Sequence, residues 1–131
     1  MLIINVDGGA RGNPGPAAIG VVMARPDGSV VEEIAEPIGT ATNNVAEYRA
    51  LLAALARARE LGETEVELIG DSELVAKQIT GDYKVKNPDM QRLHAEATAA
   101  LTGFQKWTIR TVPRAQNAAA DALVNQALDA A

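Results

Sequence analysis

The chain has 131 residues, of which 47% are hydrophobic and 22% charged, so it is long enough for one domain spanning residues 1–131 and too apolar to be disordered. It contains no cysteine and no apolar run long enough for a secretion signal or a membrane span, which excludes disulfides and thiolate metal sites and leads us to expect a cytoplasmic protein. Its net charge of −5 argues against a nucleic-acid partner, but residues 81–116 carry six basic against three acidic residues, which is compatible either with an enzyme acting on a polyanion or with ordinary surface charge.

The first third of the chain is typical of an antiparallel meander. Residues 2–6 (LIINV) form an apolar run that predicts a buried strand, and the glycine- and proline-rich stretch after Asp7 predicts a turn. Residues 17–24 and 29–38 are the next two strand-like runs, and the Asp-Gly pair at 27–28 indicates a hairpin turn between them.

The rest of the chain alternates helices with strands. Residues 45–61 carry apolar residues at helical spacing, with Gly62 just beyond them, and predict a long helix. The later runs predict, in order, a strand at 65–70, a helix at 71–79, a loop at 81–89, a helix at 90–101, a strand at 106–112 and a helix at 116–128.

This order of elements predicts an α/β fold with a five-stranded mixed sheet flanked by helices. Three antiparallel strands come first, and the later strands join the sheet parallel to the first one through crossover connections. Reactive groups in open sheets gather beyond the carboxyl ends of central strands. Asp7 and Asp71 both lie at such ends.

Four carboxylates stand out, although three of them have an ordinary structural explanation. Asp7 could belong to an Asp-Gly turn, Glu47 could close a capping box that begins at Asn44, and Asp71 could cap the helix that follows it. Asp121 is harder to explain, because it lies inside a predicted helix, near the apolar stripe, with no Lys or Arg three or four residues away.

Together the four acids suit a metal-dependent hydrolase. Hard divalent cations such as Mg²⁺ bind a few carboxylates together with water and phosphate oxygens. Two such ions about 4 Å apart can activate a water and stabilise the leaving oxygen in phosphodiester cleavage. Four acids without a cysteine fit this chemistry better than a zinc or iron site.

Four motifs of the chain also occur together in one enzyme family. They read DGGARGNPGPAAIG from residue 7, ATNNVAEYRALLAAL from residue 41, GDSELVAKQITG from residue 70 and VPRAQNAAADALVNQAL from residue 112. In this order and spacing, which covers essentially the whole chain, the sequence resembles type 1 ribonuclease H, and specifically the compact archaeal-like subgroup that also occurs in some bacteria.

The resemblance implies a ribonuclease H-like fold and endonucleolytic hydrolysis of RNA strands paired with DNA, giving 5′-phosphate ends. It implies two Mg²⁺ or Mn²⁺ ions per site as the cofactor. Asp7, Glu47 and Asp71 match the family residues that hold these ions, and Asp121 matches the residue that completes the second metal position. RNA–DNA hybrid is the implied partner, double-stranded RNA is a second candidate because some compact members cut it, and we expect a monomer without membrane contact.

The resemblance also implies a set of substrate contacts. Amide-rich residues at the start of the long helix suit a phosphate or a 2′-hydroxyl, although plain turn and cap chemistry explains the same residues. The expected contacts are Asn13, Thr42, Asn43, Asn44, Ser72, Lys84, Lys86, Arg114 and Asn117.

The chain departs from the family pattern at several positions. Many bacterial members carry a histidine in the loop before the last aspartate, where this chain reads VPRAQN, and we expect Arg114 to assist in its place. His94 matches no motif. Glu73 replaces a glutamine that touches the substrate in many members. The basic handle of some members is reduced to Lys84 and Lys86, which predicts weaker and more salt-sensitive binding.

The sequence leaves one alternative to the enzyme open and excludes another. The missing histidine and the short handle are compatible with a catalytically weak or inactive module that binds hybrid or double-stranded RNA. A nucleotide-binding loop at residues 6–16 is excluded, because the stretch lacks both the P-loop ending and the G-x-G-x-x-G spacing and is followed by a strand. We expect Gly8 and Gly9 instead to leave room beside Asp7 for a nucleic-acid backbone.

Overall fold

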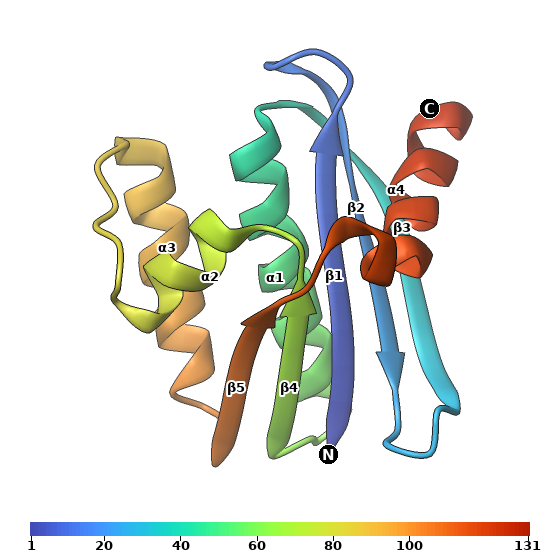
Figure 1. The fold of residues 1–131 in the computed structure, drawn as a ribbon, viewed down its shortest axis with the longest axis vertical. Helices are drawn as coiled ribbons and strands as arrows, with labels where there is room; N and C mark the ends of the chain where they lie inside the picture. The colour runs from blue at the N-terminus through green and yellow to red at the C-terminus, as the bar shows by residue number, and fades with distance from the viewer.

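The computed structural model describes all residues 1–131 and contains a five-stranded mixed sheet (Figure 1). The strands lie in the order β3-β2-β1-β4-β5, antiparallel among the first three and parallel from β1 through β4 to β5. The predicted fold class is therefore confirmed. The strands are β1 (Leu2–Ala10), β2 (Gly15–Ala24), β3 (Val30–Ala41), β4 (Glu65–Gly70) and β5 (Lys106–Thr111).

Helices cover both faces of the sheet. On one face α1 packs on β1 and β2, with α3 and α2 beside it, and on the other face α4 crosses β2 and β3 (Figure 1). No helix combines the length and the apolarity needed to cross a membrane. The helices are α1 (Asn43–Glu60), α2 (Glu73–Thr80), α3 (Pro88–Leu101) and α4 (Ala118–Ala130), with a short 3-10 turn η1 (Arg114–Asn117) before α4.

The main core lies between the sheet and α1. Alternate residues of β1 point to the same face, so Leu2, Ile4 and Val6 all meet this helix. Tyr48 and Leu51 of α1 are almost completely buried against them. Because this layer is tightly packed, α1 has a fixed position over β1, and side chains near its start are held in place.

The first strand is longer than its sequence pattern indicates. The predicted strand ends at residue 6, whereas β1 continues to Ala10 and pairs with β2 over this length, with Asp7 opposite Gly20. Pairing with β4 stops at Asn5, so Asp7 does lie beyond the parallel part of the sheet. Glycine has a low strand propensity, and the partner strand and the helices on both faces supply the stabilisation that the local sequence lacks.

Candidate active site

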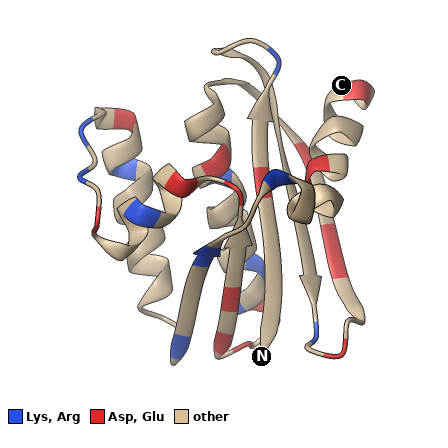
Figure 2. Cartoon of the chain, viewed as in Figure 1, with Lys and Arg blue, Asp and Glu red and all other residues tan.

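Three acidic side chains from three elements meet above the sheet. Asp7 comes from the middle of β1, Glu47 from α1 and Asp71 from the residue directly after β4, and their carboxylate oxygens lie within 4.8 Å of one another. Figure 2 shows acidic positions on these three neighbouring segments, with a basic position between β5 and α4 beside them. A polar cavity of about 330 Å³ opens here, and it is lined by Asp7, Gly8, Asn43, Glu47, Asp71 and Arg114.

Glu47 is free to face Asp7 because another residue caps its helix. The hydroxyl of Thr42 accepts a hydrogen bond from the amide of Val45 (3.2 Å), and α1 begins at Asn43. The capping box expected from Asn44 to Glu47 is therefore not formed, and Glu47 lies beyond the first turn. Threonine is one of the residues favoured at an N-cap, and here its hydroxyl reaches the amide three residues later.

Asp71 is also not a cap. The hydroxyl of Ser72 accepts a hydrogen bond from the amide of Val75 (3.2 Å), and α2 begins at Glu73. The carboxylate of Asp71 is thereby left for the cavity, and the hydroxyl of Ser72 is used inside the protein.

Asp121 lies near Asp7 and has a basic partner, rather than lying inside a helix without partners. The last helix begins at Ala118, which places Asp121 in its first turn. Arg114, seven residues earlier and on η1, reaches back so that its Nη2 lies 3.3 Å from Oδ1 of Asp121. The charge of Asp121 also contributes to the raised pKa of Asp7, so the two groups are neighbours. The basic partner that the sequence pattern lacked comes from the turn before the helix.

Burial and mutual repulsion perturb two of these acids. Burial, the charge of Asp71 and that of Asp121 raise the pKa of Asp7 to about 7, although its contact with Glu47 lowers it. Burial and the charges of Asp7 and Asp71 raise the pKa of Glu47 to about 9. At neutral pH the pair holds a proton, and a cation in the cavity would displace it.

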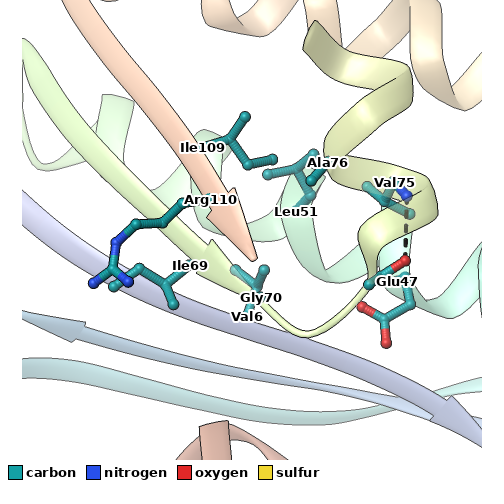
Figure 3. A pocket seen from close by; sticks show the side chains of 10 residues that line it. Val6, Glu47, Leu51, Ile69, Gly70, Val75, Ala76, Ile109 and Arg110 are labelled. Atoms are coloured by element: carbon teal, nitrogen blue, oxygen red, sulfur yellow. Dashed lines mark hydrogen bonds between the residues drawn. The ribbon is translucent and has the colours of Figure 1, made fainter. Parts of the chain in front are cut away.

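An apolar wall explains the burial of Glu47. Its side chain is one of the residues that line a small cavity near the start of α2, and the other lining residues include Val6, Leu51, Ile69 and Val75 (Figure 3). The low polarity of this wall disfavours a bare negative charge. Glu47 also lines the polar cavity, so it lies between the two.

The donor chemistry of the site fits a hard divalent cation. Asp7, Glu47 and Asp71 offer only carboxylate oxygens, and no histidine lines the cavity. Oxygen ligands of this kind are those that Mg²⁺ and Mn²⁺ prefer. A bound cation would offset the repulsion between the carboxylates, which contributes to the raised pKa values of Asp7 and Glu47.

Asn13 and Asn43, two of the expected substrate contacts, have side chains that are held by backbone amides of the protein. Oδ1 of Asn13 accepts a hydrogen bond from the amide of Asn43 (3.0 Å), and Oδ1 of Asn43 accepts one from the amide of Ala10 (2.9 Å). Both side-chain carbonyls are thus used within the protein, and both residues are exposed, which leaves their NH₂ groups available as donors. Thr42 serves as the cap described above, and Asn44 is exposed beside it.

The remaining expected contacts lie in different environments. Lys84 and Lys86 are exposed on the segment between α2 and α3, and Arg114 lines the polar cavity. Asn117 differs from the expectation, because it is only 1% exposed. Its Nδ2 donates to the carbonyl of Val6 (2.9 Å) and its Oδ1 accepts from Asn5 (3.0 Å), so its amide joins η1 to β1 instead of reaching a substrate.

The two glycines beside Asp7 have a packing role in addition to the one expected. Gly8 does line the polar cavity, but a Cβ there would lie 2.2 Å from the carbonyl carbon of Ala46 and 2.5 Å from the amide nitrogen of Glu47, so the missing side chain makes room for α1. Gly9 faces Val124 of α4 at 3.6 Å. The signal in the sequence was present, since glycine within a strand marks a close backbone approach, but the approaching backbone is that of the protein itself.

Comparison with known proteins places these features in a family. The chain matches a family model described as reverse transcriptase-like over residues 5–127. It is similar to the Ribonuclease HI of Halobacterium salinarum, with 54% identity over 123 residues that cover 94% of this chain and 62% of that protein. It is 49% identical to the bifunctional protein Rv2228c of Mycobacterium tuberculosis, covering 99% of this chain and 36% of that protein. The chain thus spans less than two thirds of the length of these relatives.

Solved structures agree with this family. The crystal structure of RNase H1 from Halobacterium salinarum matches with a TM-score of 0.97 and 52% identity, covering 99% of this chain and 98% of that one. A crystal structure of LC11-RNase H1 in complex with an RNA/DNA hybrid matches with a TM-score of 0.95 and 43% identity, covering 99% and 98% of the two chains.

Proposed function

This chain belongs to the type 1 ribonuclease H family, and we propose that it is a metal-dependent endonuclease that hydrolyses the RNA strand of RNA–DNA hybrids and leaves 5′-phosphate ends. The similarity to a Ribonuclease HI and to an RNase H1 crystallised with a hybrid supports this choice of activity and substrate. Double-stranded RNA is the second substrate to be tested.

The observation that carries the proposal is the meeting of three carboxylates in a polar cavity. Oxygens of Asp7, Glu47 and Asp71 within 4.8 Å of one another repel each other, and burial adds to the cost. If the site were purely structural, replacing one of the acids by a neutral residue would stabilise the protein. A site that binds divalent cations needs all three. This reasoning supports catalysis over a module that only binds nucleic acid.

Asp7, Glu47 and Asp71 would hold one Mg²⁺ or Mn²⁺ ion, and Asp7 with Asp121 would hold a second. Bound ions of this kind supply an activated water and offset the charge that develops on the leaving oxygen. Asp7 interacts with each of the other three acids, which suits it to be the shared ligand. The rigid β1 and the packed start of α1 hold the carboxylates in position before the ions arrive, so little reorganisation is needed.

Asn13 and Asn43 would orient the nucleic acid beside the carboxylates. The bonds that their carbonyls accept fix these two side chains and leave their NH₂ groups available as donors. Donors in fixed positions suit the acceptors that a hybrid offers there, which are phosphate oxygens, the 2′-hydroxyl and the edges of bases in the minor groove. Thr42 and Asn44 lie at the same helix start and extend this set.

Arg114 would place a positive charge where other members have a histidine. Its side chain is 79% exposed, contacts Asp121 and lines the cavity. A guanidinium stays protonated at any working pH, so it would bind the substrate phosphate and steady Asp121 but would not transfer a proton.

A labelled RNA–DNA hybrid incubated with the protein in Mg²⁺ or Mn²⁺ tests the proposal. We expect internal cuts in the RNA strand only, with 5′-phosphate ends, and no cuts when the divalent cation is chelated. Labelled double-stranded RNA in a parallel reaction measures the second substrate. Binding of the hybrid without cleavage in either cation would contradict the proposal and indicate a binding module.

A further inference from the structure

A buried glutamine connects the start of α1 to the lysine-bearing segment between α2 and α3. Gln78 of α2 is 4% exposed, and its Oε1 accepts a hydrogen bond of 2.6 Å from the hydroxyl of Tyr48. Its Nε2 donates to the backbone carbonyl of Lys84 at 3.4 Å. Tyr48 is the residue after Glu47 and is itself completely buried. Both ends of this amide are therefore used inside the protein, one on each element.

A second glutamine holds the next carbonyl of the same segment. Nε2 of Gln91, on α3, donates to the carbonyl of Val85 at 2.9 Å. The side chain of Val85 is half-buried against the main core, whereas Lys84 and Lys86 on either side of it are exposed. Residues 81–87, which we call the lysine segment, are thus held at two consecutive carbonyls and one apolar side chain.

The packing around Gln78 supports a role beyond filling the core. A leucine at this position would fill similar space without the cost of burying an amide. His94 of α3 adds a further contact, since its Nε2 lies 3.0 Å from the backbone carbonyl of Gln78. The lysine segment crosses from α2 to α3 at the edge of the molecule, where Figure 2 shows basic positions in blue. The start of the segment is tied to α2 by the backbone bond from the amide of Tyr83 to the carbonyl of Lys77 (3.1 Å). The two residues after it have no such backbone bond, and the side chains of Gln78 and Gln91 hold their carbonyls.

We propose that Gln78 and Gln91 are positioning residues that hold the lysine segment in the conformation in which Lys84 and Lys86 meet the backbone phosphates of a bound hybrid. This inference rests on the proposed function. Two lysines on a mobile segment would lose conformational freedom on binding, and a segment held beforehand avoids part of that cost. The two lysines would in this way contribute more to the affinity for the hybrid than they would on a mobile segment.

Steady-state cleavage of a labelled hybrid by the whole chain tests the inference with two variants. Gln91→Ala changes an exposed residue and should fold normally, and Gln78→Leu removes the buried amide. Gln105→Ala is the matched control, because this glutamine is exposed before β5 and its side chain makes no bond to the lysine segment. We expect the KM for the hybrid to rise about fivefold in each of the two variants, with kcat nearly unchanged, and no change in the control.

Double-mutant cycles separate positioning from general damage to the fold. In a background carrying Lys84→Ala and Lys86→Ala, the same glutamine changes should raise the KM no further, because the segment then has no lysines to present. A KM within twofold of the unaltered chain for Gln91→Ala, or an equal rise in the background without lysines, would overturn the inference while leaving the proposed function intact. Absence of cleavage by the unaltered chain would instead contradict the proposed function.

Discussion

Gly8 lies directly against the backbone of Glu47: a Cβ added to Gly8 would come within 2.5 Å of the Glu47 amide nitrogen. This approach lets the start of α1 lie close over β1, on the strand that also carries Asp7. Asp7 and Glu47, which are 40 residues apart in the sequence, can therefore meet because Gly8 has no side chain to keep α1 away from β1. The geometry of the carboxylate cluster depends on this glycine as much as on the acids.

Gly8→Ala should damage both stability and activity. The methyl group would overlap the backbone of α1, which cannot move without disturbing the core, so we expect a loss of about 2 kcal/mol or more in the free energy of unfolding. A displacement of Glu47 by about 1 Å should lower kcat about 100-fold. Gly9→Ala is the matched control, since its nearest neighbour, Val124, is at an ordinary contact distance of 3.6 Å. Equal Tm values and rates for the two variants would show that the close approach is unimportant.

The stability of the metal-free protein should fall as the pH rises. The pKa values of Asp7 and Glu47 are raised in the folded state to about 7 and about 9, so the folded protein holds more protons than the unfolded chain between about pH 4 and about pH 9. The contribution of these two acids to stability is therefore fully present below their unfolded pKa values and is lost as the pH rises through the folded ones. Thermal melts in a chelator from about pH 5 to about pH 9 should show a falling Tm, and excess Mg²⁺ should reduce the fall. A Tm that rises over this range would contradict the crowding of the acids.

Arg114→Ala should reduce activity without reducing stability much. The ion pair with Asp121 is largely exposed, and pairs of this kind contribute little to folding. Loss of the positive charge beside the cavity should lower kcat/KM for a hybrid about tenfold, through its effect on the substrate phosphate and on Asp121. Arg25→Ala is the control, because Arg25 pairs with Glu63 at the opposite end of the sheet. If both variants cut at the rate of the unaltered chain, Arg114 has no role in the reaction.

Asn13→Asp tests whether the side-chain NH₂ group of Asn13 binds the substrate. The carboxylate keeps the bond that Oδ1 accepts from the amide of Asn43, but it removes the NH₂ donor and adds a negative charge. We expect a nearly unchanged Tm and a KM for the hybrid that rises about tenfold, because repulsion from the phosphates replaces a hydrogen bond. An unchanged KM would mean that Asn13 only supports the turn between β1 and β2.

The order of elements and the grouping of the acids follow from local patterns. The strand-like runs, the helical periodicity before Gly62 and the Asp-Gly turn predict the meander and the parallel strands that the structure contains. Asp71 follows its strand as expected. The motifs that resemble the family indicate all four acids from the sequence alone.

Contacts between distant segments could not be predicted from those patterns. Asn5 in a buried strand required a polar partner, but nothing local points to Asn117, which lies 112 residues later. The same holds for the bond between Tyr48 and Gln78. Local preference also ended β1 too early, because pairing with β2 and packing on both faces outweigh the low strand propensity of Gly8 and Gly9.

The most direct test of a metal-dependent active site is Asp7→Asn in the hybrid cleavage assay, with the Tm measured on the same sample. Asp7 interacts with all three other acids, so its neutral isostere should lower cleavage in Mg²⁺ or Mn²⁺ about 1,000-fold or more. Relief of repulsion should at the same time raise the unfolding free energy of the metal-free protein by about 1–3 kcal/mol near neutral pH. Cleavage by Asp7→Asn at the rate of the unaltered chain would contradict the assignment of this cluster as the active site.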